Sequence, residues 1–208
     1  MPMEAPKWPH VPIDRYYVYH FVREWAPSIR GTVLNVGAGS TDMFRSLFDD
    51  HDYLSVDAQA STGPDLVADG ADLPYEDDEG PDCILCHQVL EHVADPQAVV
   101  DEFLRILAPG GMLLLTTPFH PVYHPDPEDY WRFTQAGLAL LLREWHEVAV
   151  EPYGNRRVLS AFIEGMDLRD CDPRWIEVAD PHVPLGYSVR ATKARVPKLR
   201  PSRRRGGA

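Results

Sequence analysis

The chain of 208 residues is long enough for one domain of ordinary size, and 44% of its residues are hydrophobic. Its net charge of −12 argues against a broad nucleic-acid-binding surface, although six basic residues and no acids occupy positions 195–208. No apolar run approaches the roughly 20 residues that span a membrane, and the proline-rich start lacks the apolar core of a signal peptide, so we expect a soluble cytoplasmic protein.

Helical and strand patterns alternate along the chain. Residues 13–27 carry Val18, Phe21, Val22 and Trp25 on one stripe and predict an amphipathic helix. Short apolar runs predict strands at 32–36, 52–57, 65–68, 82–86, 112–117, 148–152 and 187–191. Further helices are predicted at 41–50, after a cap at Asp95, after a cap at Thr134 and at 157–166.

This alternation favours an α/β fold with a Rossmann-like, doubly wound and mostly parallel sheet of seven strands, covered by helices on both faces. We predict one domain over residues 31–194. An N-terminal capping helix region precedes it at 1–30, and a disordered basic tail follows at 195–208.

One segment, Cys83-Ile84-Leu85-Cys86-His87, matches the C-x-x-C-H pattern of c-type haem attachment. Haem attachment needs export from the cytoplasm, and no export signal is evident. A strand here would also point the two sulfurs to opposite faces of the sheet. We therefore interpret Cys83 and Cys86 as small buried apolar side chains in a reducing compartment.

The first predicted strand runs into a Gly-x-Gly turn at Gly37-Ala38-Gly39, and the second strand ends at Asp57. In a parallel sheet the glycines let the backbone approach a nucleoside, and the acid accepts hydrogen bonds from its ribose. Nicotinamide dinucleotides favour a third glycine, where this chain has Asp42. Since a carboxylate repels a diphosphate, the turn favours a phosphate-free ligand such as S-adenosylmethionine.

Five motifs in order resemble those of class I S-adenosylmethionine-dependent methyltransferases of the small-molecule, type 11-like kind. They are residues 35–39, Asp57, 69–75, 83–93 and 107–111, and the resemblance covers about residues 30–145. It implies S-adenosylmethionine as the cofactor and S-adenosylhomocysteine as the product. The cofactor contacts that it implies are Asn35, Gly37, Ala38, Gly39, Asp57, Ala58, Asp69, Gly70 and His87. The family usually has an acid at position 35, so Asn35 gives up a charge attraction to the methionine ammonium.

Residues 118–133 form a proline-rich segment at the ligand edge of the fifth strand. Their H-x-x-P-x-D-Y-W-R-F-T pattern is similar to one in glycan and natural-product tailoring methyltransferases. Methylation of a hydroxyl gains from a general base, and a histidine of near-neutral pKa suits that task. We therefore predict His124 as the base, with His120 second and Asp129 third.

Other residues around this segment allow two interpretations each. Tyr130, Trp131 and Phe133 either wall an acceptor pocket or pack against the next helix, and Arg132 is expected to form a structural salt bridge. Metal-ligand residue types occur at Glu91, His92, His120, His124 and Asp126, but without a tight pattern such as H-E-x-x-H. We predict no metal, and we expect Glu91 and His92 to orient a helix start beside the cofactor.

The sequence thus predicts a methyltransferase that acts on a small-molecule acceptor, at a hydroxyl of a sugar or natural-product metabolite. We expect a monomer or homodimer with no nucleic-acid or membrane partner. Asn35 leaves open a catalytically silent partner subunit. A nicotinamide oxidoreductase would have to bind its cofactor despite Asp42, and RNA methylation would depend on the basic tail.

Overall fold

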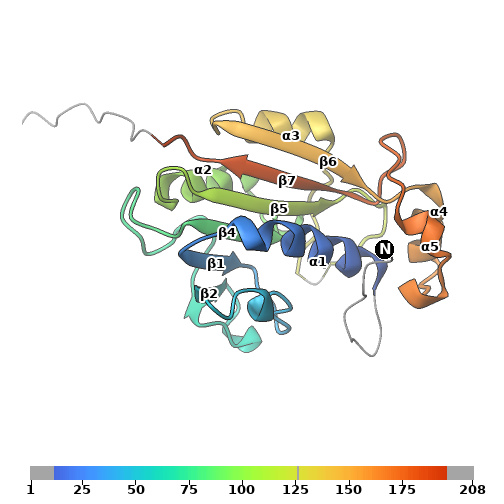
Figure 1. Cartoon of the computed structure of the whole chain (residues 1–208), viewed down its shortest axis with the longest axis horizontal. Coiled ribbons are helices and arrows are strands. Elements are labelled where there is room, and N and C mark those ends of the chain that lie inside the picture. Colours follow the sequence, from blue (N-terminus) through green and yellow to red (C-terminus); the bar gives the residue numbers. More distant parts are fainter. Residues whose placement is uncertain (1–11, 126, 196–208) are drawn as a thin grey trace, which may run out of the picture.

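A sheet of seven strands forms the centre of the molecule in the computed structural model, which describes residues 12–125 and 127–195 (Figure 1). The strands are β1 (Thr32–Val36), β2 (Asp52–Asp57), β3 (Leu66–Val67), β4 (Cys83–His87), β5 (Met112–Pro118), β6 (Glu147–Tyr153) and β7 (Gly186–Thr192). Their order is β3-β2-β1-β4-β5-β7-β6, and β7 runs antiparallel to β5 and β6 while the other pairs are parallel. The predicted α/β fold is confirmed.

Helices cover both faces of this sheet (Figure 1). They are α1 (Ile13–Trp25), α2 (Pro96–Ile106), α3 (Gln135–Leu141), α4 (Arg156–Ile163) and α5 (Pro173–Ile176), with 3₁₀ turns η1 (Ala26–Ser28), η2 (Arg45–Leu47), η3 (Ala60–Thr62), η4 (Leu90–His92) and η5 (Leu168–Asp170). Val100 of α2 and Leu138 of α3 pack with Ile84 on one face. Val18 of α1 packs with Leu85 on the other.

Local capping explains where two helices begin. The Asp95 carboxylate accepts hydrogen bonds from the backbone N–H groups of Gln97 and Ala98, both at 3.1 Å, and Pro96 opens α2. The Thr134 hydroxyl likewise accepts from the Gly137 N–H at 3.0 Å and starts α3. Both predicted caps are confirmed.

The helix predicted over residues 41–50 is wrong, because only the 3₁₀ turn η2 forms there. The Asp42 carboxylate accepts a hydrogen bond from the Phe44 N–H at 3.3 Å and another from the Tyr53 hydroxyl at 2.7 Å. Short acidic side chains that bond to nearby backbone N–H groups compete with helix formation. Phe44 and Phe48 are nevertheless buried, with 4% and 1% exposure.

Cys83 and Cys86 lie on opposite faces of the sheet, as predicted, because they belong to separate core clusters. Both thiols are free and fully buried, and burial raises the pKa of each. Within the described residues, no helix has the length and apolarity to cross a membrane. Residues 1–11 of the predicted capping region and 196–208 of the predicted tail lie outside those residues.

Candidate active site

A cavity of about 1290 Å³ opens at the carboxyl ends of β1, β2, β4 and β5. The chain crosses from one side of the sheet to the other between β3 and β4, so β1 and β4 flank the switch point where ligands of open α/β sheets bind. The predicted residues Gly37, Ala38, Gly39, Asp57, Ala58, Asp69, Gly70, His87, His120 and His124 all line this one cavity. Asn35 and Asp129 are not among its lining residues.

The two glycines of the turn after β1 have different surroundings. Both have positive φ, +72° at Gly37 and +63° at Gly39, a region that side chains disfavour. A Cβ at Gly37 would lie 2.2 Å from a methyl carbon of Val89, so this glycine lets two loops pack together. A Cβ at Gly39 would meet nothing within 4 Å, so its Cα faces open space and leaves room for a ligand.

Asp57 stands beside this turn at the end of β2. One carboxylate oxygen accepts a hydrogen bond from the Gly39 N–H at 3.0 Å, and the other accepts from the Gln59 N–H at 2.9 Å. Each oxygen has a second lone pair for a ligand hydroxyl. The carboxylate is therefore held in position for the ribose that the sequence predicts.

Asn35 lies beneath the turn with 2% exposure. Its side-chain N–H donates to the Asp42 carboxylate at 3.2 Å. Asp42 also lies outside the cavity lining, so its charge acts on a ligand only at longer range. The cofactor contact expected of Asn35 stays a prediction.

His87 and Gln88 form the tip of β4. The His87 Nδ1 lies 3.1 Å from the Thr116 hydroxyl, and burial together with Arg15 lowers the pKa of His87 to about 3. This imidazole is therefore neutral at physiological pH. Gln88, which the sequence analysis did not single out, has φ +56°, a conformation that clusters at functional sites.

The histidines of the segment after β5 differ in their surroundings. His120 is 5% exposed and packs on Phe162, and burial lowers its pKa to about 4. His124 is more open, with 39% of its side chain exposed, and its Nδ1 lies 3.2 Å from the Asp129 carboxylate. His124 therefore has the better access to a ligand in the cavity.

Asp129 lies behind His124 as a positioning partner. Its carboxylate accepts hydrogen bonds from Arg132, at 2.8 Å to Nη2, and from the His124 backbone N–H at 3.1 Å. The hydrogen bond from Arg132 holds the pKa of Asp129 well below its usual range. Arg132 also donates to the carbonyl oxygens of His120 and Val122, so it is the structural ion pair that the sequence predicts.

The candidate acceptor-wall residues Tyr130, Trp131 and Phe133 lie outside the cavity lining. Trp131 donates its indole N–H to the Val93 carbonyl at 2.8 Å, and Phe133 packs against the main core cluster. Tyr130 is 52% exposed. The contacts of Trp131 and Phe133 favour the packing interpretation, whereas the exposed Tyr130 supports neither interpretation.

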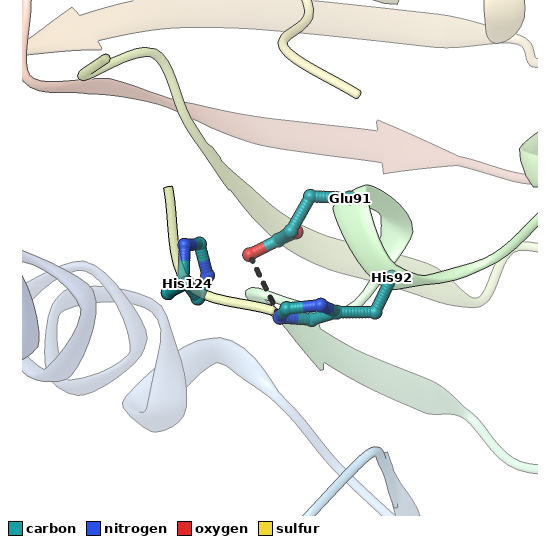
Figure 2. Close-up of side chains that lie close together, drawn as sticks. All are labelled: Glu91, His92 and His124. Atoms are coloured by element: carbon teal, nitrogen blue, oxygen red, sulfur yellow. Dashed lines mark ion pairs between the residues drawn. The ribbon is translucent and has the colours of Figure 1, made fainter. Parts of the chain in front are cut away.

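A second group of polar side chains meets at the cavity edge, where Glu91, His92 and His124 point toward one another (Figure 2). One nitrogen or oxygen of each lies within 4.8 Å of the others. Burial raises the pKa of Glu91 to about 8, and its nearer oxygen lies 3.9 Å from His92 Nε2. The residues come from η4 and from the loop after β5, so no sequence pattern placed them together.

Comparison with known proteins agrees with this geometry. Residues 34–115 match the family model described as "Methyltransferase domain". These residues, about two fifths of the chain, are similar to a methyltransferase domain. The fold is similar to that of a SAM-dependent methyltransferase from Archaeoglobus fulgidus, with a TM-score of 0.60, 16% identity, and coverage of 86% of this chain and 94% of that one.

Two curated relatives are similar to parts of this chain. A ubiquinone biosynthesis O-methyltransferase of Psychrobacter cryohalolentis is 50% identical over 62 residues, which are 30% of this chain and 22% of the relative. A demethylmenaquinone methyltransferase of Clavibacter sepedonicus is 25% identical over 134 residues, covering 58% of this chain and 54% of the relative. The chain thus spans from about a fifth to about half the length of these relatives.

S-adenosylmethionine is the cofactor of this class of domain, and the cavity fits it. The open space over Gly39 admits a bulky nucleoside against the backbone, and Asp57 offers fixed acceptors for two ribose hydroxyls. Asp69 lies farther along the same cavity, with a carboxylate oxygen already bonded to the Ala71 N–H at 2.9 Å. Its other oxygen is the acceptor expected to take the adenine amine.

Proposed function

We propose that the protein transfers a methyl group from S-adenosylmethionine to a hydroxyl oxygen of a small molecule, such as a sugar or a natural-product metabolite. The observation that carries the proposal is the single cavity, which Gly39 and Asp57 line on the cofactor side and His120 and His124 on the other. The similarity to a ubiquinone biosynthesis O-methyltransferase adds hydroxyl groups of ubiquinone precursors to the acceptors worth testing.

The cofactor would supply a methyl group on a positively charged sulfur. In the transfer, the acceptor oxygen bonds to the methyl carbon, the S–C bond breaks with its electrons left on sulfur, and the hydroxyl proton is lost. The chain must place the oxygen in line with that methyl and exclude water, which accounts for most of the rate gain in such reactions. His124 is positioned to take the proton. The Asp129 carboxylate faces its Nδ1, so the hydrogen resides on Nδ1 and the lone pair on Nε2.

Titration calorimetry tests the cofactor step, with S-adenosylmethionine and S-adenosylhomocysteine as ligands of the full chain. Binding of both is expected, and binding of neither at high micromolar concentration would end the proposal. Incubation with methyl-labelled S-adenosylmethionine and small-molecule extract of the producing organism then tests turnover. The labelled product identifies the acceptor.

A catalytically silent partner subunit is the second candidate, and Asn35 is the observation that favours it. Its amide is engaged by Asp42 and brings no negative charge to the methionine ammonium. This alternative predicts that S-adenosylmethionine binds but that no S-adenosylhomocysteine forms with any acceptor. Formation of labelled product above the rate without acceptor rules it out.

A further inference from the structure

Glu91 occupies an unusual environment in this chain. The residue is fully buried, and neither carboxylate oxygen has a hydrogen-bond partner among the described residues. Burying an unpartnered polar or charged group is costly, so side chains of this kind normally have a hydrogen-bond donor or a cation beside them. The guanidinium of Arg132 does not fill that role, because Asp129 and three backbone carbonyls use its donors.

The histidine beside Glu91 already has its tautomer fixed. His92 Nδ1 lies 2.8 Å from the Glu128 carbonyl oxygen, which can only accept, so the hydrogen resides on Nδ1. The lone pair of His92 is therefore on Nε2, the atom 3.9 Å from the Glu91 carboxylate (Figure 2). Histidines that ligate metals are typically held in this way, by an acceptor at their other nitrogen.

His124 has a similar arrangement. Its Nδ1 faces the Asp129 carboxylate at 3.2 Å, so its Nε2 also carries a lone pair. The rings of His92 and His124 stand nearly perpendicular, at 86°, with their centroids 4.9 Å apart. Each histidine thus has an acceptor behind it, and both adjoin the same buried carboxylate.

We propose that Glu91, His92 and His124 form a binding site for a divalent transition-metal ion such as Zn²⁺ or Mn²⁺. Two imidazoles and one carboxylate suit these ions, whereas Mg²⁺ and Ca²⁺ favour sites made of oxygen alone. Ligand atoms about 2.1 Å from Zn²⁺ lie roughly 3.4 Å apart. The three ligand atoms here lie within 4.8 Å of one another, so side-chain shifts of about 1 Å complete the site.

The site lies on the wall of the cavity that holds the predicted cofactor residues, because His92 and His124 are both among its lining. Three protein ligands leave at least one position open for water or an acceptor hydroxyl. This part of the inference rests on the proposed function. A cation there lowers the pKa of a bound hydroxyl, and it makes His124 a ligand instead of the base.

The test is calorimetric titration of Zn²⁺ into the full chain after removal of metals with a chelator, with the Co²⁺ absorption spectrum as a second readout. One ion per chain is expected. Each of Glu91→Gln, His92→Asn and His124→Asn is expected to weaken Zn²⁺ binding at least about 100-fold. His146→Asn, in an exposed histidine outside the cavity, is the matched control and keeps the affinity.

Glu91→Gln is the most informative variant, because it has the same shape and removes no hydrogen bond within the described residues. Thermal melts show which variants fold, and the folded ones decide the outcome. Absence of one-to-one binding, or one-to-one binding that the folded ligand variants leave unchanged, overturns the inference. Titration of S-adenosylmethionine into the same metal-free samples distinguishes the two proposals. If S-adenosylmethionine binds but no Zn²⁺ site is found, the metal-site inference fails and the proposed function is unaffected.

Discussion

The carboxylate of Asp57 is hydrogen-bonded to the backbone N–H of Gly39, so the tip of β2 fixes the turn that follows β1. The Gln59 N–H holds the other oxygen of the carboxylate. The acid and the glycine turn are therefore one unit, positioned before any ligand arrives. Preorganisation of this kind lowers the entropy that binding must offset.

Replacement of Asp57 by alanine should weaken S-adenosylmethionine binding by about 10- to 100-fold, since hydrogen bonds to a charged group contribute about 1.5–3 kcal/mol. Calorimetric titration measures the loss. Asp52→Ala is the matched control, because Asp52 is an exposed acid at the opposite end of the same strand. Equal affinity in Asp57→Ala and wild type would remove Asp57 from the site.

The two glycines of the turn should respond differently to alanine. In Gly37→Ala the new methyl meets Val89 at 2.2 Å as well as a positive φ, so we expect a loss of about 3 kcal/mol or more in unfolding free energy. In Gly39→Ala only the positive φ is unfavourable, so we expect the unfolding free energy to fall by about 1 kcal/mol. Thermal or urea unfolding checks both values.

The affinity for S-adenosylmethionine is a second quantity to measure in the glycine variants. The methyl in Gly39→Ala projects into open space beside the cavity, so S-adenosylmethionine should bind at least about 10-fold more weakly to a protein that is still folded. A Gly39→Ala protein with unchanged affinity would mean that the cofactor does not approach the backbone there.

Much of the fold could be predicted because its signals are local. Asp95 and Pro96 start α2 through contacts within three residues, and the apolar runs that became strands are continuous in the sequence. The segment after Gly39 could not be predicted in this way. Asp42 accepts hydrogen bonds from the Phe44 N–H and from the hydroxyl of Tyr53, eleven residues away on β2, in the place where the helix was expected.

The candidate site also has a part that could be predicted from the sequence and a part that could not. Gly39 and Asp57 were predictable, because parallel topology brings successive strand tips together whatever the details of packing. The group of Glu91, His92 and His124 was not, because it joins two loops 32 residues apart through side-chain directions. The positive φ of Gln88 likewise leaves no mark in the sequence, since glutamine has no preference for that conformation.

His124→Ala should lower turnover by about 10²- to 10⁴-fold and leave S-adenosylmethionine affinity nearly unchanged, whether the imidazole takes a proton or binds a cation. Asp129→Asn should lower turnover less, because it disturbs only the orientation of His124. Steady-state kinetics and calorimetry on the same samples separate the two quantities. A parallel loss of turnover and cofactor affinity in His124→Ala would show that this residue supports the fold of the cavity.

Acid stability should depend in part on Asp65, which accepts hydrogen bonds from the Ser55 backbone N–H and hydroxyl, both at 2.8 Å, and from Arg45. The Ser55 N–H and Arg45 lower its pKa to about 2, so its contribution is complete above pH 4 and disappears as the pH falls toward 2. With 39% of the side chain exposed, solvent screening limits this contribution to about 1 kcal/mol. Urea unfolding of wild type and Asp65→Asn should therefore differ by about 1 kcal/mol at pH 7 and converge as the pH falls from 4 toward 2. A constant difference down to pH 3, or the same pattern in the exposed Asp52→Asn control, would contradict this assignment.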